Sequence, residues 1–453
     1  MPGHSRIYAT VLLAAAGAAA ASAQTFTLLA SFNVTNGNNP WYGPLAQGID
    51  GNLYGTTFSG GADNDGTVFK ITPGGTLTVV RSFNVTNGDF PWSGLVLATS
   101  GNFYGATSAG GADNDGSVFK ITTAGRLTTL ASFNVTDGYN PVGPLIQGTD
   151  GNFYGTTYGG GANNDGEVFK ITPGGALTVL HSFDVTDGDF PTGALVEATD
   201  GNFYGTTQQG GANNNGSVFR MTPAGVLTTI HSFDATDGVA PSGLIQGSDG
   251  NFFGTTYLGG ANNDGEVFEI TPGGTLTVLH SFDVTDGFNP GSGVLVQATD
   301  GNLYGTTYYG GAHNDGTVFR ITLGGHLTTL HSFDSADGYQ AAGALVQATD
   351  GSFYGTTVSG GANNDGAVYS LSVGLSPFVK TVPTSGTVGA AVKILGTDLT
   401  GATGVSFNGT AAAFTVVSPT LITATVPTGA TSGKIEVATP GGTLASNVAF
   451  RVR

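Results

Sequence analysis

The sequence has 453 residues, of which 77 are glycine, 10% are charged and none is cysteine. This composition excludes a coiled coil and an acidic disordered tail, which both need many more charges, and it excludes disulfides and cysteine chemistry. Acidic residues outnumber basic ones by 31 to 13, and the formal net charge of −18 disfavours nucleic acid and anionic membranes as partners.

Residues 1–23 have the pattern of a secretory signal peptide. An apolar, alanine-rich run extends from about Tyr8 to Ala20, and Ala21-Ser22-Ala23 offers a cleavage site before Gln24. The run is shorter than the roughly 20 residues that a membrane span needs. We therefore expect a secreted or cell-surface protein, with no transmembrane segment in the mature chain.

Seven copies of one motif, spaced by 49–51 residues, follow in residues 24–373. Asp200-Gly201 in one copy predicts a tight type I′ hairpin between two strands. No window shows a helical period, and β-branched and aromatic runs in that copy predict strands at residues 195–199, 202–207, 217–222 and 226–233. Each copy carries a Ser-Phe dipeptide, and its phenylalanines are Phe32, Phe83, Phe133, Phe183, Phe233, Phe282 and Phe333.

Four antiparallel strands per copy predict an all-β fold, a seven-bladed β-propeller with four-stranded blades. The repeats begin with a lone strand at residues 25–32 and end near Ser372 without a fourth strand. We expect the N-terminal strand to complete the last blade, which removes two sheet edges that would favour aggregation. A β-solenoid is the alternative, but it gives the lone first strand no partner.

The pattern changes at residue 376. Residues 376–453 contain short apolar runs with turn signals every 8–12 residues, which is typical of an Ig-like β-sandwich. The charge changes as well, because this segment holds five basic and two acidic residues, a net charge of +3. We therefore expect a second domain at the C-terminal end.

Both segments resemble known families. The motifs Asp-Gly-Asn-Leu/Phe-Tyr-Gly-Thr-Thr, Gly-Gly-Ala-x-Asn-Asp-Gly-x-Val-Phe-Lys and Leu-x-x-Leu-x-Ser-Phe resemble the GloVer tandem repeat of secreted bacterial proteins, over about residues 25–372. The tail is similar to an IPT/TIG domain, an immunoglobulin-like module, at Pro383–Gly389, Val405–Thr410, Thr425–Pro427 and Thr439–Thr443. Such modules are mostly spacers or interaction units, and neither resemblance implies a known reaction.

The long connections of the predicted propeller all lie on one face, which we call the loop face. Function usually resides in loops on a rigid scaffold, so we expect the ligand there. Aromatic rings beside Asn and Asp suit sugar rings, although these side chains could equally anchor the loops over the blade junctions. The loop-face aromatic residues that we predict to bind a ligand are Trp41, Tyr42, Phe90, Trp92, Tyr139, Phe190, Phe288 and Tyr339.

Other polar groups give weaker signals. The loops with Asp63-Asn64-Asp65 and its equivalents suit either turn chemistry or calcium. Four histidines, at His181 and its equivalents, fall in different blades and cannot form one zinc site. Glutamines near the axis could hold water there, and Glu197 is a lone carboxylate among them.

We find no paired carboxylates for glycoside hydrolysis and no nucleophile or phosphate-loop motif, so we assign no catalytic and no metal-binding residue. The sequence predicts an exported, monomeric, non-catalytic binding or adhesion protein whose loop face takes extracellular glycans. Two alternatives remain: an enzyme acting on extracellular polysaccharide or a lactone, and a structural cell-surface protein that contacts other proteins. We expect no cofactor other than calcium.

Overall fold

The computed structural model describes residues 24–41, 43–291 and 294–453. The predicted signal peptide, residues 1–23, and Tyr42 lie outside these ranges. Within them every regular element is a β-strand, which confirms the all-β prediction. No helix capable of crossing a membrane occurs in this part of the chain.

Repeated antiparallel sheets make up the structure as far as Ser372, and the described residues form seven of them. Six of these sheets run in chain order from a short first strand to a longer fourth strand, and in the seventh the fourth position is taken by β1 from the start of the chain. The first strands are β2 (Ala46–Gln47), β6 (Val96–Leu97), β10 (Ile146–Gln147), β14 (Val196–Glu197), β19 (Ile245–Gln246), β24 (Val296–Gln297) and β28 (Val346–Gln347). The second strands are β3 (Leu53–Thr57), β7 (Phe103–Thr107), β11 (Phe153–Thr157), β15 (Phe203–Thr207), β20 (Phe252–Leu258), β25 (Leu303–Tyr309) and β29 (Phe353–Thr357).

The two remaining positions complete each sheet. The third strands are β4 (Thr67–Ile71), β8 (Ser117–Ile121), β12 (Glu167–Ile171), β16 (Ser217–Met221), β21 (Glu266–Ile270), β26 (Thr317–Ile321) and β30 (Ala367–Ser372). The fourth strands are β5 (Leu77–Ser82), β9 (Leu127–Ser132), β13 (Leu177–Ser182), β17 (Leu227–Ser232), β22 (Leu276–Ser281), β27 (Leu327–Ser332) and β1 (Thr25–Ser31). Two sheets gain a further short strand on β20 or β25, namely β18 (Val239–Pro241) and β23 (Phe288–Pro290).

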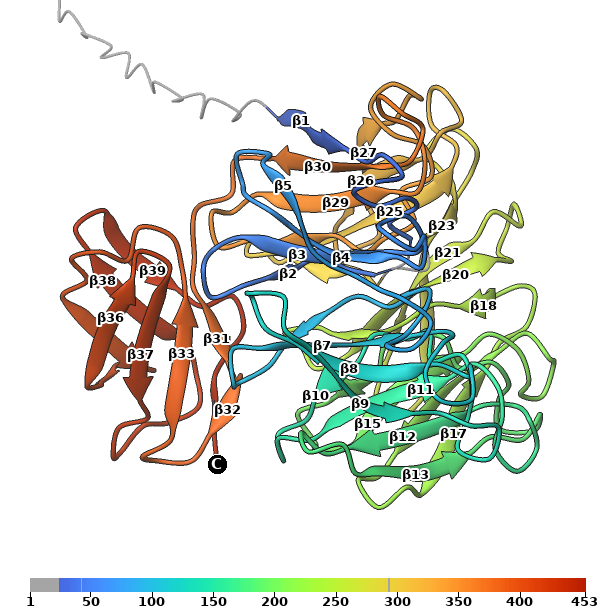
Figure 1. The fold of residues 1–453 in the computed structure, drawn as a ribbon, viewed down its shortest axis with the longest axis horizontal. Coiled ribbons are helices and arrows are strands. Elements are labelled where there is room, and N and C mark those ends of the chain that lie inside the picture. Colours follow the sequence, from blue (N-terminus) through green and yellow to red (C-terminus); the bar gives the residue numbers. More distant parts are fainter. Residues whose placement is uncertain (1–23, 42, 292–293) are drawn as a thin grey trace, which may run out of the picture.

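The first strand of the chain belongs to the last sheet. β1 pairs antiparallel with β30, with Thr25 opposite Ser372 and Ser31 opposite Ala367. In Figure 1 the blue β1 lies beside the orange β30. The two ends of the repeats are therefore joined by a strand pair rather than by the chain.

The core lies between neighbouring sheets. One cluster joins Tyr54 and Phe83 of the sheet β2–β5 to Phe103 and Phe119 of the sheet β6–β9, all nearly inaccessible to solvent. Glycine in the second strand makes room for this packing, because a Cβ on Gly155 would lie 2.7 Å from ring and leucine carbons. The buried apolar pattern of each repeat thus fastens one sheet to the next.

The tight turn between the first two strands differs from the prediction. The N–H of Gly201 donates to the carbonyl of Ala198, and only Gly201, with φ of 83°, is left-handed. This is a three-residue turn that ends in a left-handed glycine, whereas a type I′ turn needs two residues with positive φ. The Asp200 carboxylate favours this geometry by accepting the main-chain N–H of Asn202 at 2.9 Å and the hydroxyl of Tyr204 at 3.0 Å.

The glutamines near these turns connect neighbouring sheets. Gln246 Oε1 accepts the main-chain N–H of Thr199 at 2.9 Å, and Gln297 Oε1 accepts that of Ser248 at 2.8 Å. Glu197 takes the same place in its sheet and accepts both the N–H and the hydroxyl of Thr149. Its carboxylate therefore has a structural hydrogen-bonding role.

The C-terminal strands form two four-stranded antiparallel sheets and a parallel pair around an apolar core of their own. One sheet contains β31 (Lys380–Val382), β33 (Ala391–Leu395), β37 (Leu421–Thr425) and β36 (Phe414–Ser418). The other contains β35 (Thr410–Ala411), β34 (Gly404–Phe407), β38 (Ile435–Thr439) and β39 (Gly442–Ala445). The parallel pair is β32 (Ser385–Gly386) with β40 (Arg451–Val452).

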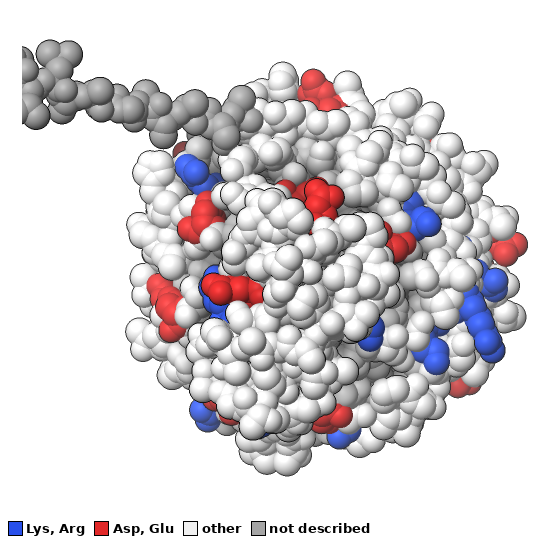
Figure 2. Space-filling view, turned by 90° about the vertical axis from the view of Figure 1, so that its left-hand side faces the viewer, with Lys and Arg blue, Asp and Glu red and all other residues white. Residues whose placement is uncertain are grey.

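These sheets contact the repeats at the tight turns, which we call the turn face. Arg451 Nη1 donates to the carbonyl of Thr199 at 2.8 Å, and Thr420 Oγ1 donates to that of Ile49 at 2.9 Å. Figure 1 shows the red C-terminal sheets on this side, which leaves the loop face uncovered by them. Viewed from the C-terminal sheets, charged side chains are few and scattered (Figure 2).

Candidate functional site

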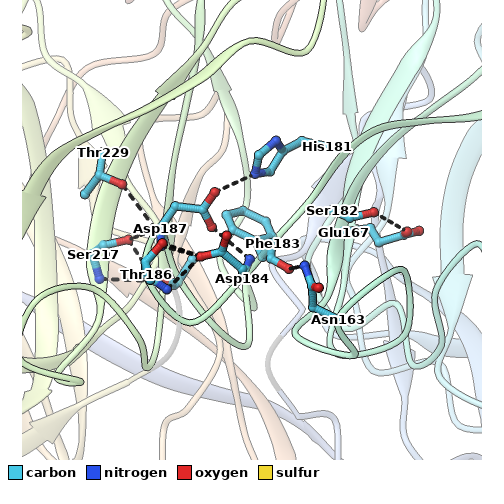
Figure 3. Close-up of polar contacts among 11 residues, drawn as sticks. Asn163, Glu167, His181, Ser182, Phe183, Asp184, Thr186, Asp187, Ser217 and Thr229 are labelled. Atoms are coloured by element: carbon cyan, nitrogen blue, oxygen red, sulfur yellow. Dashed lines mark hydrogen bonds and ion pairs between the residues drawn. The ribbon is translucent and has the colours of Figure 1, made fainter.

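The loop face is built from connectors, each of which leads from the last strand of one sheet to the first strand of the next. The connector between β13 and β14 begins with a turn in which Asp184 Oδ1 accepts the N–H of Thr186 at 2.8 Å. Asp187 follows and fixes the connector, because its carboxylate accepts from His181 Nε2 at 2.9 Å and its carbonyl accepts from Ser217 Oγ at 2.9 Å (Figure 3). The histidines therefore anchor connectors and do not gather into a metal site.

The middle of this connector joins two sheets. Phe190 donates its N–H to the carbonyl of Asp165 in the preceding sheet, at 3.2 Å. Its own carbonyl accepts the N–H of Gln208 in the following sheet, at 3.1 Å. Main-chain hydrogen bonds on both sides thus hold the aromatic residue at the junction of the two sheets.

Two of these aromatic residues have a strained main chain. Phe90 and Phe190 have φ of 53° and 56°, in the left-handed region. The equivalent residues of the other connectors also have positive φ, and they are Asn39, Asn140, Ala240, Asn289 and Gln340. Bulky residues in this region cost about 1–3 kcal/mol, whereas asparagine tolerates it well. Two connectors therefore retain a phenylalanine at a position where the main chain favours asparagine.

Ring stacking accounts for the direction of these side chains. The Phe90 ring lies on that of Phe58 at a centroid distance of 4.6 Å and an angle of 13°. The Phe190 ring lies on that of Tyr158 at 4.3 Å and 9°. Such pairs contribute about 0.5–1.5 kcal/mol beyond their burial, which partly offsets the main-chain strain.

The two tryptophans of the protein come together at the first of these junctions. The rings of Trp41 and Trp92 are 5.5 Å apart, and that of Trp92 is 5.3 Å from Phe58. Together with Phe90 they form what we call the aromatic cluster (Trp41, Phe58, Phe90 and Trp92). All four side chains are partly exposed, so the cluster presents aromatic surface on the loop face.

A cavity of about 360 Å³ opens where the connectors converge. Trp92 and Tyr158 supply aromatic surface to it, and Asn140 and Gln208 supply amide groups. Small or apolar side chains from further connectors complete the lining, namely Pro44, Val142, Pro144, Thr192, Ala194, Val294 and Ala344. The cavity can accommodate a ligand with a flat apolar face, and its amide groups can form hydrogen bonds with hydroxyl groups at the edge of that ligand.

The predicted aromatic residues thus divide into groups. Trp92 lines the cavity and Trp41 packs against Trp92. Phe90 stacks on Phe58, whose ring contacts Trp92, and Phe190 stacks on the lining residue Tyr158. Phe288 and Tyr339 lie elsewhere, on either side of Tyr309 at 5.2 and 6.2 Å. Tyr139 pairs through its main chain with Gly159, and Tyr42 lies outside the described residues.

Sequence reasoning missed Phe58, Tyr158 and Tyr309. Phe58 and Tyr158 directly follow a second strand and Tyr309 is the last residue of one, and all three supply the rings on which connector aromatics stack. The signal was the variation at residues 58–59 and 308–309 among otherwise similar copies. The structure shows that part of this variation places an aromatic ring opposite a connector.

The asparagine-rich loops use turn chemistry. Asn64 has φ of 68°, and its Oδ1 accepts the N–H of Gly60 at 3.2 Å, an arrangement repeated at Asn114 and Asn364. Across the described residues no group of three or more His, Cys, Asp or Glu side chains could hold a metal ion.

Burial raises the pKa of several carboxyl groups near the loop face. Burial, reinforced by the Asp65 carboxylate, raises the pKa of Asp89 to about 6. Burial and the Asp165 carboxylate likewise raise the pKa of Asp189. Burial also raises the pKa values of Glu167 and Glu266, although a serine hydroxyl donates to each. These glutamates occupy third-strand positions where other sheets have Thr, Ser or Ala, and they do not line the cavity.

Comparison with known proteins identifies the repeat. The family described as the Gloeobacter/Verrucomicrobia repeat matches residues 18–199 and 191–415. No curated protein matches the sequence.

Solved structures resemble the chain in fold. A fungal alcohol oxidase of the AA5 family, in complex with copper, is 14% identical with a TM-score of 0.55, over 94% of this chain and 98% of the oxidase. The PQQ-bound aldose sugar dehydrogenase of Streptomyces coelicolor is 14% identical with a TM-score of 0.44, over 77% of this chain and 98% of the dehydrogenase. At this identity the likeness to the oxidase shows a propeller-like fold and nothing about activity.

Proposed function

The chain belongs to the Gloeobacter/Verrucomicrobia repeat family, and from this premise we propose that it is a non-catalytic binding protein whose loop face takes extracellular glycans. The cavity where the connectors converge carries the proposal. Its rim offers Trp92 and Tyr158 for stacking on the C–H face of a sugar, and Asn140 and Gln208 for hydrogen bonds to hydroxyl groups.

The retained strain at the connectors supports a binding role. Phe90 and Phe190 keep left-handed main chains that asparagine would adopt at lower cost, and each ring stacks on a residue at or beside the cavity. Strained residues held firmly by their surroundings are frequent at ligand sites. A rigid aromatic rim loses little conformational entropy when a ligand binds.

We further propose that the seven sheets are the blades of a closed seven-bladed propeller, with β1 completing the last blade. The pairing of β1 with β30 supports closure. The C-terminal strands β31–β40 would then be an Ig-like sandwich of the IPT/TIG kind, and its two sheets around one core support this assignment. The domain contacts the turn face, so the proposed binding site stays accessible.

Export and partners complete the proposal. We infer secretion or surface display from the signal-peptide pattern of residues 1–23. The net charge of −18 favours neutral glycans over polyanions such as nucleic acid, because like charges repel. We expect a monomer that binds without a redox cofactor.

The experiment is a pull-down with insoluble polysaccharides and a titration with soluble oligosaccharides, using protein from Gln24 onward. We expect Trp92→Ala to weaken binding at least tenfold because it removes a stacking surface of the cavity. Phe288→Ala is the matched control, since it removes a loop-face ring that stacks on Tyr309 away from the cavity. Reducing ends are measured in parallel.

The outcomes separate the alternatives. Binding that is lost in Trp92→Ala and kept in Phe288→Ala supports the proposal. New reducing ends would replace it with a polysaccharide-cleaving enzyme. An absence of retention across a broad panel would overturn glycan binding and favour a protein partner.

A further inference from the structure

Two connectors carry an aspartate that interacts electrostatically with an aspartate in a loop of the neighbouring sheet. Asp89, between β5 and β6, interacts electrostatically with Asp65, in the loop between β3 and β4. Two repeats later, Asp189 interacts with Asp165 in the same way. The other connectors carry Asn38, Tyr139, Val239, Phe288 and Tyr339 at this position, so among the described residues only these two connectors place an aspartate here.

Each connector aspartate has one buried carboxylate oxygen without a hydrogen-bond partner, and Asp89 is also buried as a whole residue whereas Asp189 is half-buried. The Asp89 residue is 8% exposed. Its Oδ1 atom and that of Asp189 are inaccessible to solvent and accept no hydrogen bond from the residues that the structure describes. A buried carboxylate oxygen without a partner is costly, and the cost recurs at both junctions.

A second carboxylate nearby increases that cost. Two like charges in one buried place are stable only when a proton or a cation compensates one of them. The surroundings at both junctions supply main-chain N–H groups but no basic side chain in ion-pair contact with Asp89 or Asp189 among the described residues. The junctions therefore have the negative charge and the unused oxygens that a cation would satisfy.

We propose that each of the pairs Asp65–Asp89 and Asp165–Asp189 binds one calcium ion. Carboxylate oxygens are the ligands that this hard cation prefers, and its flexible coordination suits a site made by two loops. Calcium takes six to eight oxygens, so main-chain carbonyl groups and water must supply the ligands beyond the two carboxylates. Magnesium fits less well, because it demands an octahedral geometry that is close to ideal.

The position of the sites gives the cation a structural consequence. Asp89 and Asp189 directly precede Phe90 and Phe190, the strained residues that stack beside the cavity. An ion that ties each connector to the preceding loop would hold both rings in place. The inference does not depend on the glycan proposal, because its test counts bound ions.

The test is the stoichiometry of calcium binding. Protein from Gln24 onward is stripped with chelator and titrated with calcium by calorimetry at neutral pH. We expect two ions per chain, one ion for Asp89→Asn, and none for Asp89→Asn combined with Asp189→Asn. Asp115→Asn is the matched control, because Asp115 makes the same main-chain contact, to Asn140, but its connector carries Tyr139 in place of an aspartate.

Each result decides the matter. Circular dichroism first verifies that every variant keeps the β-sheet signature. A stoichiometry that falls from two to one to zero, unchanged in Asp115→Asn, supports both sites. An absence of binding at millimolar calcium, or two ions still bound to the double variant, would overturn the proposal, whatever happens to glycan binding.

Discussion

The buried Asp89 carboxyl leads to a prediction about stability and pH. Its pKa rises from 3.8 in the unfolded chain to about 6 in the native state, because of burial and the Asp65 carboxylate. A carboxyl with a raised native pKa favours folding below the unfolded pKa, and this contribution is lost as the pH rises through about 6. Asparagine cannot ionise, so Asp89→Asn should stabilise the chelator-treated protein at about pH 8 and change little at about pH 4.

The magnitude follows from the shift. About two pKa units at 1.36 kcal/mol each give an upper limit of about 3 kcal/mol, and solvent screening at the loop face lowers this to about 1–2 kcal/mol. The assay is urea unfolding of both proteins in chelator at the two pH values. The reasoning would be refuted if the variant and the unmodified protein had the same free energy of unfolding at both pH values. It would also be refuted if the variant were the less stable of the two at about pH 8. Saturating calcium should remove the difference if the ion binds there.

Three further perturbations test the fold. Gly155→Ala should lower the free energy of unfolding by about 1–3 kcal/mol in urea, since its Cβ would lie 2.7 Å from Phe169 Cζ. Gln297→Leu should cost about 1 kcal/mol and lower the Tm, because it removes the bond to the Ser248 N–H. Burial lowers the pKa of His331, so the neutral imidazole stabilises the native state above about pH 6.5 and this stabilisation is lost as the pH falls. His331→Gln should therefore reduce the loss of Tm at acidic pH, measured in a pH series of thermal melts.

These predictions have their own controls. Gly74→Ala adds a methyl group where no heavy atom other than Thr72 Oγ1, at 3.9 Å, lies within 4 Å, and it should be nearly neutral. An equal loss in both glycine variants would contradict the packing argument. A Gln297→Leu protein with an unchanged Tm would show that the inter-sheet hydrogen bond contributes no net stability, as the natural Leu97 would suggest.

The repeats could be predicted because each copy carries the whole pattern. Strand positions could be predicted from runs of β-branched and aromatic residues, such as the run that ends at Thr207. The pairing of β1 with β30 could be predicted because the first strand has no partner in its own copy. The first strands were predicted too long, since β14 covers only Val196–Glu197. The turn after it was predicted wrongly, because Asp200 bonds to Asn202 and Tyr204 rather than adopting a positive φ.

The candidate site was predicted only in outline. The connectors and their aromatic residues were visible in sequence, but the convergence of Trp92 with Tyr158 depends on how distant sheets are arranged. The left-handed main chain of Phe90 was also hidden, because it results from hydrogen bonds to two neighbouring sheets. The bond from Arg451 to Thr199 depends on the docking of the C-terminal sheets, for which the sequence carries no local signal.

The pairing of β1 with β30 has a consequence for how the protein is made. The two partners are the first and last strands of the repeats, so the seam closes only when the last repeat has been synthesised. The equilibrium cost of so long a loop is modest, because it grows only with the logarithm of its length. The kinetic cost is larger, since a nascent or truncated chain exposes β1 as an unpaired edge that can recruit another unfinished copy. Early termination within the last repeat should therefore give aggregation-prone products rather than a smaller working protein.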